Sequence, residues 1–560
     1  MSLECLRNYK SLIVDYSFIR RYGGTSLLPE FLDIVISGHK DVYVSRSFKY
    51  IHYCVIHQAD EKNASVAGAM KEFCTMLLPD KLLHSVQVTE TGEFLSKMSL
   101  VPEGCLVLAS SSMLMKRIRE KRPVFLGDIC VIDDDNGVGI FHSIPEVIDA
   151  YPEMPISPLA ASDKYLDVPV YCNVGDTVMT GSGKAVVLEK RVSAGAEGMV
   201  FTTDNPRIVA KIYHKGIITP LRWKKLQTQV KMGINSLGVC WPIDLLTYKG
   251  VPVGYTMIMG RGKTIGNVFD GPDALLNSFP ECSRLDIVTI LTDLLEKYIY
   301  LHMYDIVAGD IQLKNALIYS TNSIYLIDMD SVQVKDLPCP VGTEEFTDPR
   351  LWGKDFSSFL RRLEDEDYSI AMLVFSILFC GLHPYATRNG AETLREEIME
   401  KNFPYSVDDL SDEHIPKGGY NHIWEYLPNN LKQMLYKTFK EGGSFEALEW
   451  YEAVMAYKDA LSSHEYEDEQ AYKAFPLMDY VATDPHPISK PRFKAPSSGT
   501  GSDASKPLFK PAGSAFNNNS GSSPFGGRVT NSNEPFKRKD DNGSSGNNPG
   551  GSFGNLWNRR

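Results

Sequence analysis

Residues 309–331 read GDIQLKNALIYSTNSIYLIDMDS, and this stretch decides how the rest of the chain is interpreted. Two apolar runs in it, ALIY and IYLI, are rich in β-branched and aromatic residues and are predicted to be strands. Asp310 and Asn315 precede the first run, and Asp328 and Asp330 follow the second. An acid in such a loop can accept a hydroxyl proton, and carboxylate and amide oxygens ligate hard cations such as Mg²⁺. Any single one of these acids would more often be a turn or capping residue.

Two further elements stand earlier in the chain, and both suit a nucleotide phosphate. In VSAGAEGMVF (192–201), Gly195 and Gly198 lie between β-prone flanks, so a strand–turn–strand there brings backbone N–H groups close to phosphate oxygens. Taken alone, a glycine turn in an ordinary hairpin is the more common case. Lys211 lies in IVAKIY, a β-branched run in which a single lysine usually extends to solvent.

The order of these elements resembles the eukaryotic-type protein kinase superfamily over roughly residues 185–457. The resemblance implies that a glycine-rich loop with Gly195 and Gly198 covers ATP and that Lys211 holds its α- and β-phosphates. It also implies that Asp310 faces the acceptor hydroxyl as the catalytic acid/base, whereas Asn315 and Asp328 hold Mg²⁺.

Three more segments match that family. YTMIMGRG (255–262) falls at the family's hinge, where backbone groups around Met257 and Met259 are expected to pair with adenine. CPVGTEEFTDP (339–349) resembles an activation segment, and EDYSIAMLVFSILFCGLHPY (366–385) resembles the large core helix led by an Asp. The V-G-T-x-E-[FY] and D-x-D-S patterns resemble an atypical, compact bacterial subfamily.

The chain also departs from the family pattern. The family's H-R-D is Ala308-Gly309-Asp310 here, so the arginine that clasps an activation-loop phosphate is absent, and the D-F-G glycine is Asp330. No Glu occurs between Lys211 and Gly262, so the usual helix partner of the lysine is missing. Gln227 is the expected substitute, as an amide can accept a hydrogen bond from an ammonium.

The chain of 560 residues is long enough for two or three domains. We expect an α/β domain over 1–150, a linker over 151–173, a β-rich lobe over 174–262, a helical lobe over 263–460 and a connector with a tail over 461–560. The fold class is therefore α+β, with a bilobal protein-kinase-like fold, an N-terminal α/β domain and a disordered tail.

The N-terminal domain faintly resembles PIN-like nucleases. Asp15 ends an apolar strand, and acids return as Asp128 and as Asp133, Asp134 and Asp135, where they could gather around a divalent metal. Solvated turn acids are the commoner explanation, and an inactive, partner-binding PIN-like fold is favoured over a nuclease.

The last 70 residues contain 33 Gly, Ser and Asn, which predicts disorder. Phe493, Phe509 and Phe536 recur there in similar settings and could form a repeated docking motif for a protein partner, although a merely solubilising tail fits the composition equally well.

Composition narrows the location and the partners. The net charge of −12 makes a general nucleic-acid binder unlikely. The N-terminus carries charge where a secretory signal would be apolar, and the longest apolar run, Tyr368 to Leu382, has 15 residues, fewer than the ~20 that span a bilayer as a helix. A buried core helix and a cytoplasmic protein without membrane contact are expected.

Three functions compete at this point. The first is a kinase that uses ATP and Mg²⁺ to phosphorylate Ser/Thr hydroxyls of an unidentified protein, with the N-terminal domain binding partners. The second is an ATP-binding pseudokinase scaffold, suggested by the missing Glu, Arg and Gly. The third is metal-dependent RNA cleavage by residues 1–150.

Overall fold

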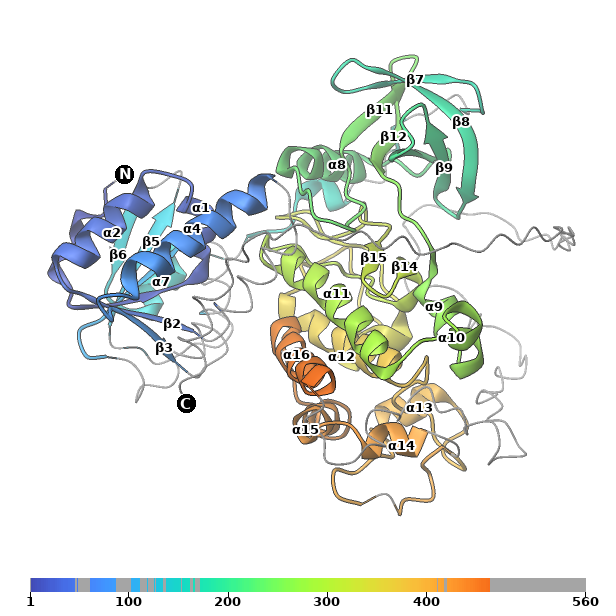
Figure 1. Ribbon diagram of the computed structural model, residues 1–560. Helices are drawn as coiled ribbons and strands as arrows, with labels where there is room; N and C mark the ends of the chain where they lie inside the picture. The colour runs from blue at the N-terminus through green and yellow to red at the C-terminus, as the bar shows by residue number, and fades with distance from the viewer. Residues whose placement is uncertain are drawn as a thin grey trace, which may run out of the picture. The chain divides into compact units, whose positions relative to one another are not determined.

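The structure is a computed structural model. It describes residues 2–45, 48, 61–86, 102–110, 118, 125, 127–133, 137–152, 154–161, 165–166, 172–409, 411–416 and 420–463. Asp134, Asp135 and the three tail residues Phe493, Phe509 and Phe536 lie outside this described part. The described residues combine helices with several sheets in a mixed α/β protein (Figure 1).

The first 150 residues contain a six-stranded sheet of order β3-β2-β1-β4-β5-β6, in which neighbouring strands are parallel except for β6. Parallel strands need crossover connections, and helices supply these where the chain is described. The strands are β1 (Ser11–Val14), β2 (Asp41–Ser45), β3 (Leu83–Val86), β4 (Leu106–Ser110), β5 (Asp128–Asp133) and β6 (Gly137–Phe141). The helices of this unit are η1 (Glu4–Asn8), α1 (Tyr16–Tyr22), α2 (Leu27–Ser37), α4 (Glu61–Leu77) and α7 (Ile144–Ala150).

Asp15 caps helix α1 in this unit. Its carboxylate accepts a hydrogen bond from the backbone N–H of Ser17 at 2.9 Å, as an N-cap residue does. Asp128 lies at the beginning of β5, whereas Asp15 follows the last residue of β1. Because β1, β4 and β5 are parallel, the two acids lie at opposite ends of the strands. Its carboxylate accepts from the Tyr9 hydroxyl and lies 2.9 Å from His142 Nδ1. The sequence-level grouping of Asp15 with Asp128 around one metal is therefore wrong.

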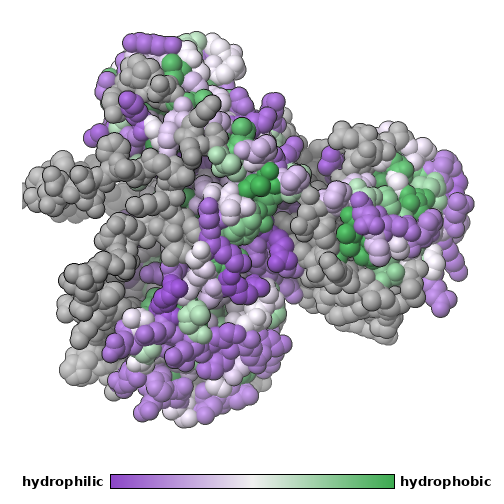
Figure 2. All heavy atoms as spheres, turned by 180° about the vertical axis from the view of Figure 1, so that it is seen from behind, coloured by the Kyte–Doolittle hydropathy of each residue, from purple (hydrophilic) through white to green (hydrophobic). Residues whose placement is uncertain are grey.

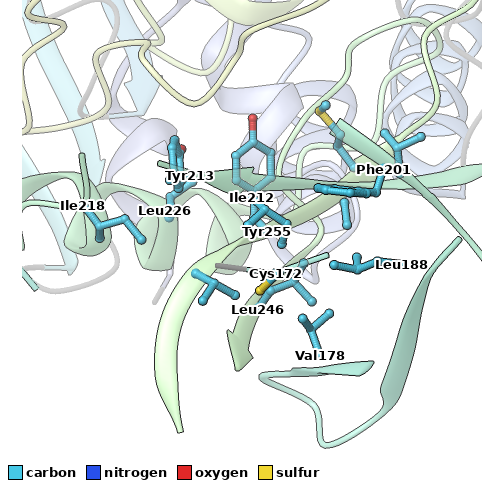
Figure 3. Close-up of a cluster of buried hydrophobic side chains, with 14 of the residues drawn as sticks. Cys172, Val178, Leu188, Phe201, Ile212, Tyr213, Ile218, Leu226, Leu246 and Tyr255 are labelled. Atoms are coloured by element: carbon cyan, nitrogen blue, oxygen red, sulfur yellow. The ribbon is translucent and has the colours of Figure 1, made fainter. Parts of the chain in front are cut away.

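Residues 177–258 form a closed barrel of order β10-β12-β11-β7-β8-β9. Its core includes Val178, Leu188, Phe201, Leu246 and Tyr255, which pack together in Figure 3. Ser182 and Gly183 lie in the tight turn that joins β7 to β8. The strands are β7 (Thr177–Thr180), β8 (Ala185–Ala194), β9 (Gly198–Thr203), β10 (Ile208–Tyr213), β11 (Asp244–Tyr248) and β12 (Val251–Ile258).

Helix α8 (Pro220–Met232) lies in the chain between β10 and β11. The side chain of Thr219 caps its first turn by accepting from the Arg222 N–H, and Pro220 occupies the first helical position, where no N–H is needed. Gly233 ends the helix in the left-handed conformation (φ 57°). Local sequence thus sets both ends of this helix.

Residues 263–463 are mainly helical and include a three-stranded sheet of order β13-β14-β15. Its strands are β13 (Lys263–Thr264), β14 (Ala316–Ser320) and β15 (Ser323–Leu326). The α-helices are α9 (Ile265–Val268), α10 (Pro272–Ser278), α11 (Arg284–His302), α12 (Asp367–Leu378), α13 (Leu394–Met399), α14 (Tyr420–Glu425), α15 (Asn429–Tyr436) and α16 (Ala447–Ser463). Shorter 3₁₀ and π-helical turns in this part are η4 (Leu313–Asn315), η5 (Glu344–Phe346), η6 (Pro349–Leu351), η7 (Leu363–Glu366) and η8 (Lys437–Glu441), and a further 3₁₀ turn, η3 (Pro158–Ala161), precedes the barrel.

Helix α12 forms the centre of this helical part. All of its residues are buried, which confirms the predicted core helix. Each large apolar side chain buried in this way contributes about 1.5–3 kcal/mol. On the face shown in Figure 2, hydrophilic residues predominate over the described helical part, as expected when its apolar residues lie inside. Among the described residues, no helix combines the length and apolar character required to cross a membrane.

Candidate active site

Hairpin β14–β15 brings two of the candidate residues together. Ala316 pairs with Leu326, and the next residues outward continue the pairing, since the backbone carbonyl of Asn315 accepts from the Ile327 N–H at 2.9 Å. Asn315 and Asp328 therefore flank the same end of the hairpin. Asp328 has φ 58°, a left-handed conformation that is rare outside glycine and is concentrated at functional sites.

Asp310 lies beside Asn315, and its oxygens have several hydrogen-bond donors. Asn315 Nδ2 donates to Asp310 Oδ2 at 2.9 Å and to its backbone oxygen at 2.8 Å. Gln312 Nε2 also donates to Oδ2, and the Thr343 hydroxyl donates to Oδ1 at 2.8 Å. Because both Asn315 bonds use the amide nitrogen, its Oδ1 is the atom left to ligate a cation.

The residues around Asp310 hold its backbone in place. Gly309 has φ 80°, and a Cβ there would lie 2.3 Å from Arg361 Nη2, so this position requires glycine. Arg361 donates to the carbonyls of Gly309, Cys339 and Val341. An arginine 51 residues beyond Asp310 thus links the loop before Asp310 to the 339–341 segment.

Lys211 connects the barrel to this region. It is 7% exposed, and its Nζ lies 3.1 Å from Asp328 Oδ1 and 2.8 Å from Asp330 Oδ1. Lys211 therefore does not extend to solvent. Burial alone would lower the pKa of Lys211, but the carboxylates of Asp330 and Asp328 outweigh burial and raise that pKa above its usual value.

Asp330 is the partner that sequence reasoning missed. Gln227 was the expected substitute for the missing glutamate, but Lys211 pairs with Asp330, two residues beyond Asp328. Gln229, two residues further along helix α8, instead donates from Nε2 to the Met329 carbonyl at 2.6 Å. The signal was present in DMDS, where an acid replaces the family's glycine, but only the folded chain places that acid at the ammonium.

The glycine turn joins β8 to β9 and has Gly195 and Gly198 at its ends. The Gly195 N–H donates to the Gly198 carbonyl at 2.8 Å. A Cβ at Gly198 would lie 2.4 Å from the Ile212 carbonyl oxygen, so close strand packing requires glycine there, whereas Gly195 has open space. The hydrogen bond between Gly195 and Gly198 therefore closes an ordinary hairpin turn between β8 and β9.

The predicted adenine-pairing residues lie at the end of β12. Met257 is 6% exposed, belongs to the barrel core and pairs with Val209 in the neighbouring strand. The Met259 N–H already donates to the Arg207 carbonyl at 2.8 Å. That N–H is therefore already used by the Arg207 carbonyl, and adenine pairing by backbone groups around Met257 and Met259 stays a prediction.

The donor set fits Mg²⁺ bound together with a polyphosphate. The Asp328 side chain is 54% exposed, and Asp328 and Asn315 flank the same end of the hairpin, where they offer carboxylate and amide oxygens. Mg²⁺ commonly uses one or two protein carboxylates and takes its remaining ligands from water and phosphate. The described residues contain no group of three or more His, Cys, Asp and Glu arranged to hold a metal ion.

Comparisons with known proteins point the same way as the geometry. No protein-family model matches the chain. Protein kinase YegI of Escherichia coli O157:H7 is 26% identical over 302 residues, which cover 51% of this chain and 46% of that protein. Protein kinase YegI of Escherichia coli strain K12 is 26% identical over 283 residues, covering 48% and 43%. This chain therefore spans less than half the length of these curated relatives, and the similarity supports a protein-kinase-like family for about half of it.

Proposed function

We propose that residues 174–460 form a bilobal protein-kinase-like fold that transfers the γ-phosphoryl group of ATP to Ser/Thr hydroxyls of a protein. The observation that carries this proposal is the junction between the barrel and the β14–β15 hairpin. There, Lys211 contacts Asp328, and Asn315 at the other side of the hairpin end contacts Asp310.

Phosphoryl transfer requires little covalent chemistry from a protein, because catalysis rests on positioning and charge stabilisation. Lys211 would hold the α- and β-phosphates, and Asn315 and Asp328 would hold Mg²⁺. When bound, the ion neutralises charge on the transferring phosphate. Gly198 and Gly195 would bring the turn close to the nucleotide.

Asp310 would orient the acceptor hydroxyl and receive its proton. Its Oδ2 is held by Asn315 and Gln312, whereas Oδ1 accepts from the Thr343 hydroxyl. Thr343 lies in the 339–349 segment, so the same segment that would position a peptide also touches the acid that would receive its proton. This contact supports Asp310 as the group facing the acceptor.

The test is transfer of label from γ-labelled ATP, with Mg²⁺, to the protein itself or to a generic acceptor protein. We expect label with the wild type and its loss in Lys211→Met and Asp328→Ala. Label that persists in both variants would show that the site is misassigned. Nucleotide binding without any transfer by the wild type would favour the pseudokinase scaffold instead.

We also propose that the α/β unit of residues 1–150 binds the protein partner. Capping of α1 by Asp15 supports a structural role for that acid over RNA cleavage. RNA that stays intact with the full chain and Mg²⁺ is the expected result, and cleavage that stops in Asp15→Asn would contradict it.

A further inference from the structure

Asp330 is surrounded by hydrogen-bond donors. Its side chain is 1% exposed, and Oδ1 accepts from Lys211 Nζ at 2.8 Å and from the Tyr255 hydroxyl at 2.9 Å. Its Oδ2 accepts from the Tyr213 hydroxyl at 2.5 Å. A buried carboxylate is retained only when such partners offset its loss of hydration.

The strand register explains why these donors meet. Lys211 pairs directly with Tyr255 across β10 and β12, and Tyr213 follows Lys211 by two residues, so the three side chains share one face of the barrel wall. Figure 3 shows the hydroxyl groups of Tyr213 and Tyr255 pointing away from the core residues Val178 and Leu246. Three donors thus converge on one point outside the core.

Helix α8 faces the same segment with positive charge. Arg222 Nη1 lies 4.0 Å from Asp330 Oδ2, and Lys225 Nζ donates to the carbonyls of Ser331 and Pro338. Arg222, Lys225 and Gln229 are spaced three and four residues apart and form one face of the helix. The helix therefore presents cations to the segment in which the anion stands.

We propose that Asp330 is the positioning residue for Lys211 and replaces the missing helix glutamate, so that the acid of this contact comes from the loop and not from helix α8. This inference rests on the proposed function, because it assigns Lys211 to the phosphates of ATP. Asp330 acts through Lys211 and does not itself touch the nucleotide.

The donor count leaves Lys211 able to bind phosphate. An ammonium group has three N–H donors, and Asp330 and Asp328 account for two of them. Asp328 is 54% exposed and is also the candidate Mg²⁺ ligand, so the hydrogen bond that it accepts from the ammonium can be replaced by one to phosphate. The buried Asp330 keeps its hydrogen bond and holds the lysine in place. The two acids therefore have different roles although they lie two residues apart.

Arg222 extends the arrangement to the glycine turn. Its guanidinium donates two hydrogen bonds to Glu197, at 2.8 and 2.7 Å, and Glu197 lies between Gly195 and Gly198. Asp330, Arg222 and Glu197 thus connect the metal-binding loop, the helix and the turn over the nucleotide. The approach of Arg222 to Asp330, at 4.0 Å, is longer than a hydrogen bond, whereas Lys211 is hydrogen-bonded to Asp330 directly, so the main role of Asp330 is at the lysine.

The test compares Asp330→Asn with Asp293→Asn in the full chain. Asp293 Oδ1 lies 2.8 Å from Lys297 Nζ in helix α11, and Lys297 is 2% exposed. Asp293 Oδ2 also accepts from the Ile324 N–H, so the control disturbs a largely buried Lys–Asp pair and one backbone hydrogen bond outside the Lys211–Asp330 contact. Three quantities are measured: transfer at varied ATP, transfer at varied acceptor, and equilibrium binding of Mg²⁺·ADP.

We expect Asp330→Asn to lower kcat/KM for ATP and the affinity for ADP by about ten- to a hundredfold, the usual size of a lost charge-assisted hydrogen bond. The KM for the acceptor stays within about twofold, and Asp293→Asn leaves all three quantities within about twofold. A variant with a merely damaged fold would change the acceptor KM as well.

The decisive step is a double-mutant cycle with Lys211→Met. If Asp330 acts through Lys211, Asp330→Asn changes ADP affinity by less than about twofold once the ammonium is gone. If Asp330→Asn does not fold, Tyr255→Phe replaces it in the same cycle, with an expected loss of about three- to tenfold for one neutral hydrogen bond.

Full additivity in the cycle, unchanged ADP binding in Asp330→Asn, or faster transfer in that variant would each overturn the inference; the last result would mean that Asp330 restrains Lys211. If the wild type binds ADP and the double-mutant cycle gives the expected result, but no phosphate is transferred, the proposed kinase activity is refuted and the positioning role is retained. A wild type that neither binds nor transfers would refute both.

Discussion

The carboxylate of Glu366 accepts hydrogen bonds from the backbone N–H groups of Ala308 and Gly309, the two residues before Asp310. His302 Nε2 lies 2.9 Å from the same carboxylate, and Glu366 is only 2% exposed. Asp367, which leads helix α12, has a different partner, the Ser444 hydroxyl. The acid before the helix, Glu366, thus supports the loop that precedes Asp310.

Glu366→Gln should destabilise the protein and reduce transfer. The amide retains one oxygen acceptor but introduces an N–H₂ group facing the donors Ala308 N–H and Gly309 N–H. We expect a loss of about 2–3 kcal/mol in the free energy of unfolding, typical of disturbing hydrogen bonds to a buried charge. Denaturant unfolding measures it, and an unchanged midpoint would contradict the role of Glu366. Glu364→Gln, at a more exposed acid in the same 3₁₀ turn, is the control.

Gly309→Ala should be disruptive although it adds a single methyl group. The new Cβ would collide with Arg361 Nη2, and the backbone at φ 80° disfavours any residue with a side chain. We expect about 1–3 kcal/mol of destabilisation together with reduced phosphoryl transfer.

The control for that change is Gly353→Ala, where φ is 77° but nothing lies within 4 Å of the new Cβ. Comparing the two by thermal unfolding separates the backbone term from the collision with Arg361. Equal losses at both positions would show that Arg361 does not restrict the space at Gly309.

Asn315→Ala should raise the Mg²⁺ concentration required for half-maximal transfer. The change removes the amide oxygen that remains to ligate Mg²⁺ and also both donors to Asp310. We expect at least about a tenfold loss of transfer at fixed Mg²⁺, in line with the usual effect of a lost positioned group. Asn322→Ala, in the exposed turn between β14 and β15, should behave as wild type in the same titration.

The stability of the protein should fall on acidification because of His383. Burial lowers the pKa of its imidazole to about 4, from 6.5, although a backbone hydrogen bond at Glu345 opposes this. Between pH 6.5 and about 4 the unfolded chain binds the proton and the folded protein does not, so the free energy of unfolding decreases as pH falls. The full contribution is about 3 kcal/mol.

The measurement is the free energy of unfolding of wild type and His383→Gln at several pH values between 7 and 4. Subtracting the two curves isolates the histidine from the carboxylates that titrate in the same range. A difference that stays constant over this interval would show that His383 does not have the lowered pKa.

Much of the local structure could be predicted from sequence because it depends on near neighbours. The apolar runs ALIY and IYLI form strands β14 and β15, which confirms both predictions. The partner of Lys211 could not be found in this way, because Asp330 lies 119 residues further along the chain. Local propensity contains no information on such a contact.

Gln227 was the predicted partner of Lys211, but Asp330 is the partner in the structure, and motif matching could not identify it. Assigning a lost role to the nearest polar residue at the same position assumes that a contact keeps its geometry when its residues change. Here the lysine lies on strand β10 and its acid partner comes from the loop, whereas the helix carries the cation Arg222. Only the three-dimensional register of β10 and β12 shows this.

The closed barrel and the loop bearing Asp330 have a consequence for control. When a strand lysine pairs with a glutamate on a helix, an outward movement of the helix breaks the ion pair and inactivates the enzyme. Lys211 and Asp330 both lie outside helix α8, so an outward movement of that helix would withdraw Arg222 and loosen the turn at Glu197 while the lysine stayed paired. If the proposed ATP site is correct, an effector acting on this helix would change how the turn encloses the nucleotide and would leave the pairing of Lys211 with Asp330 in place.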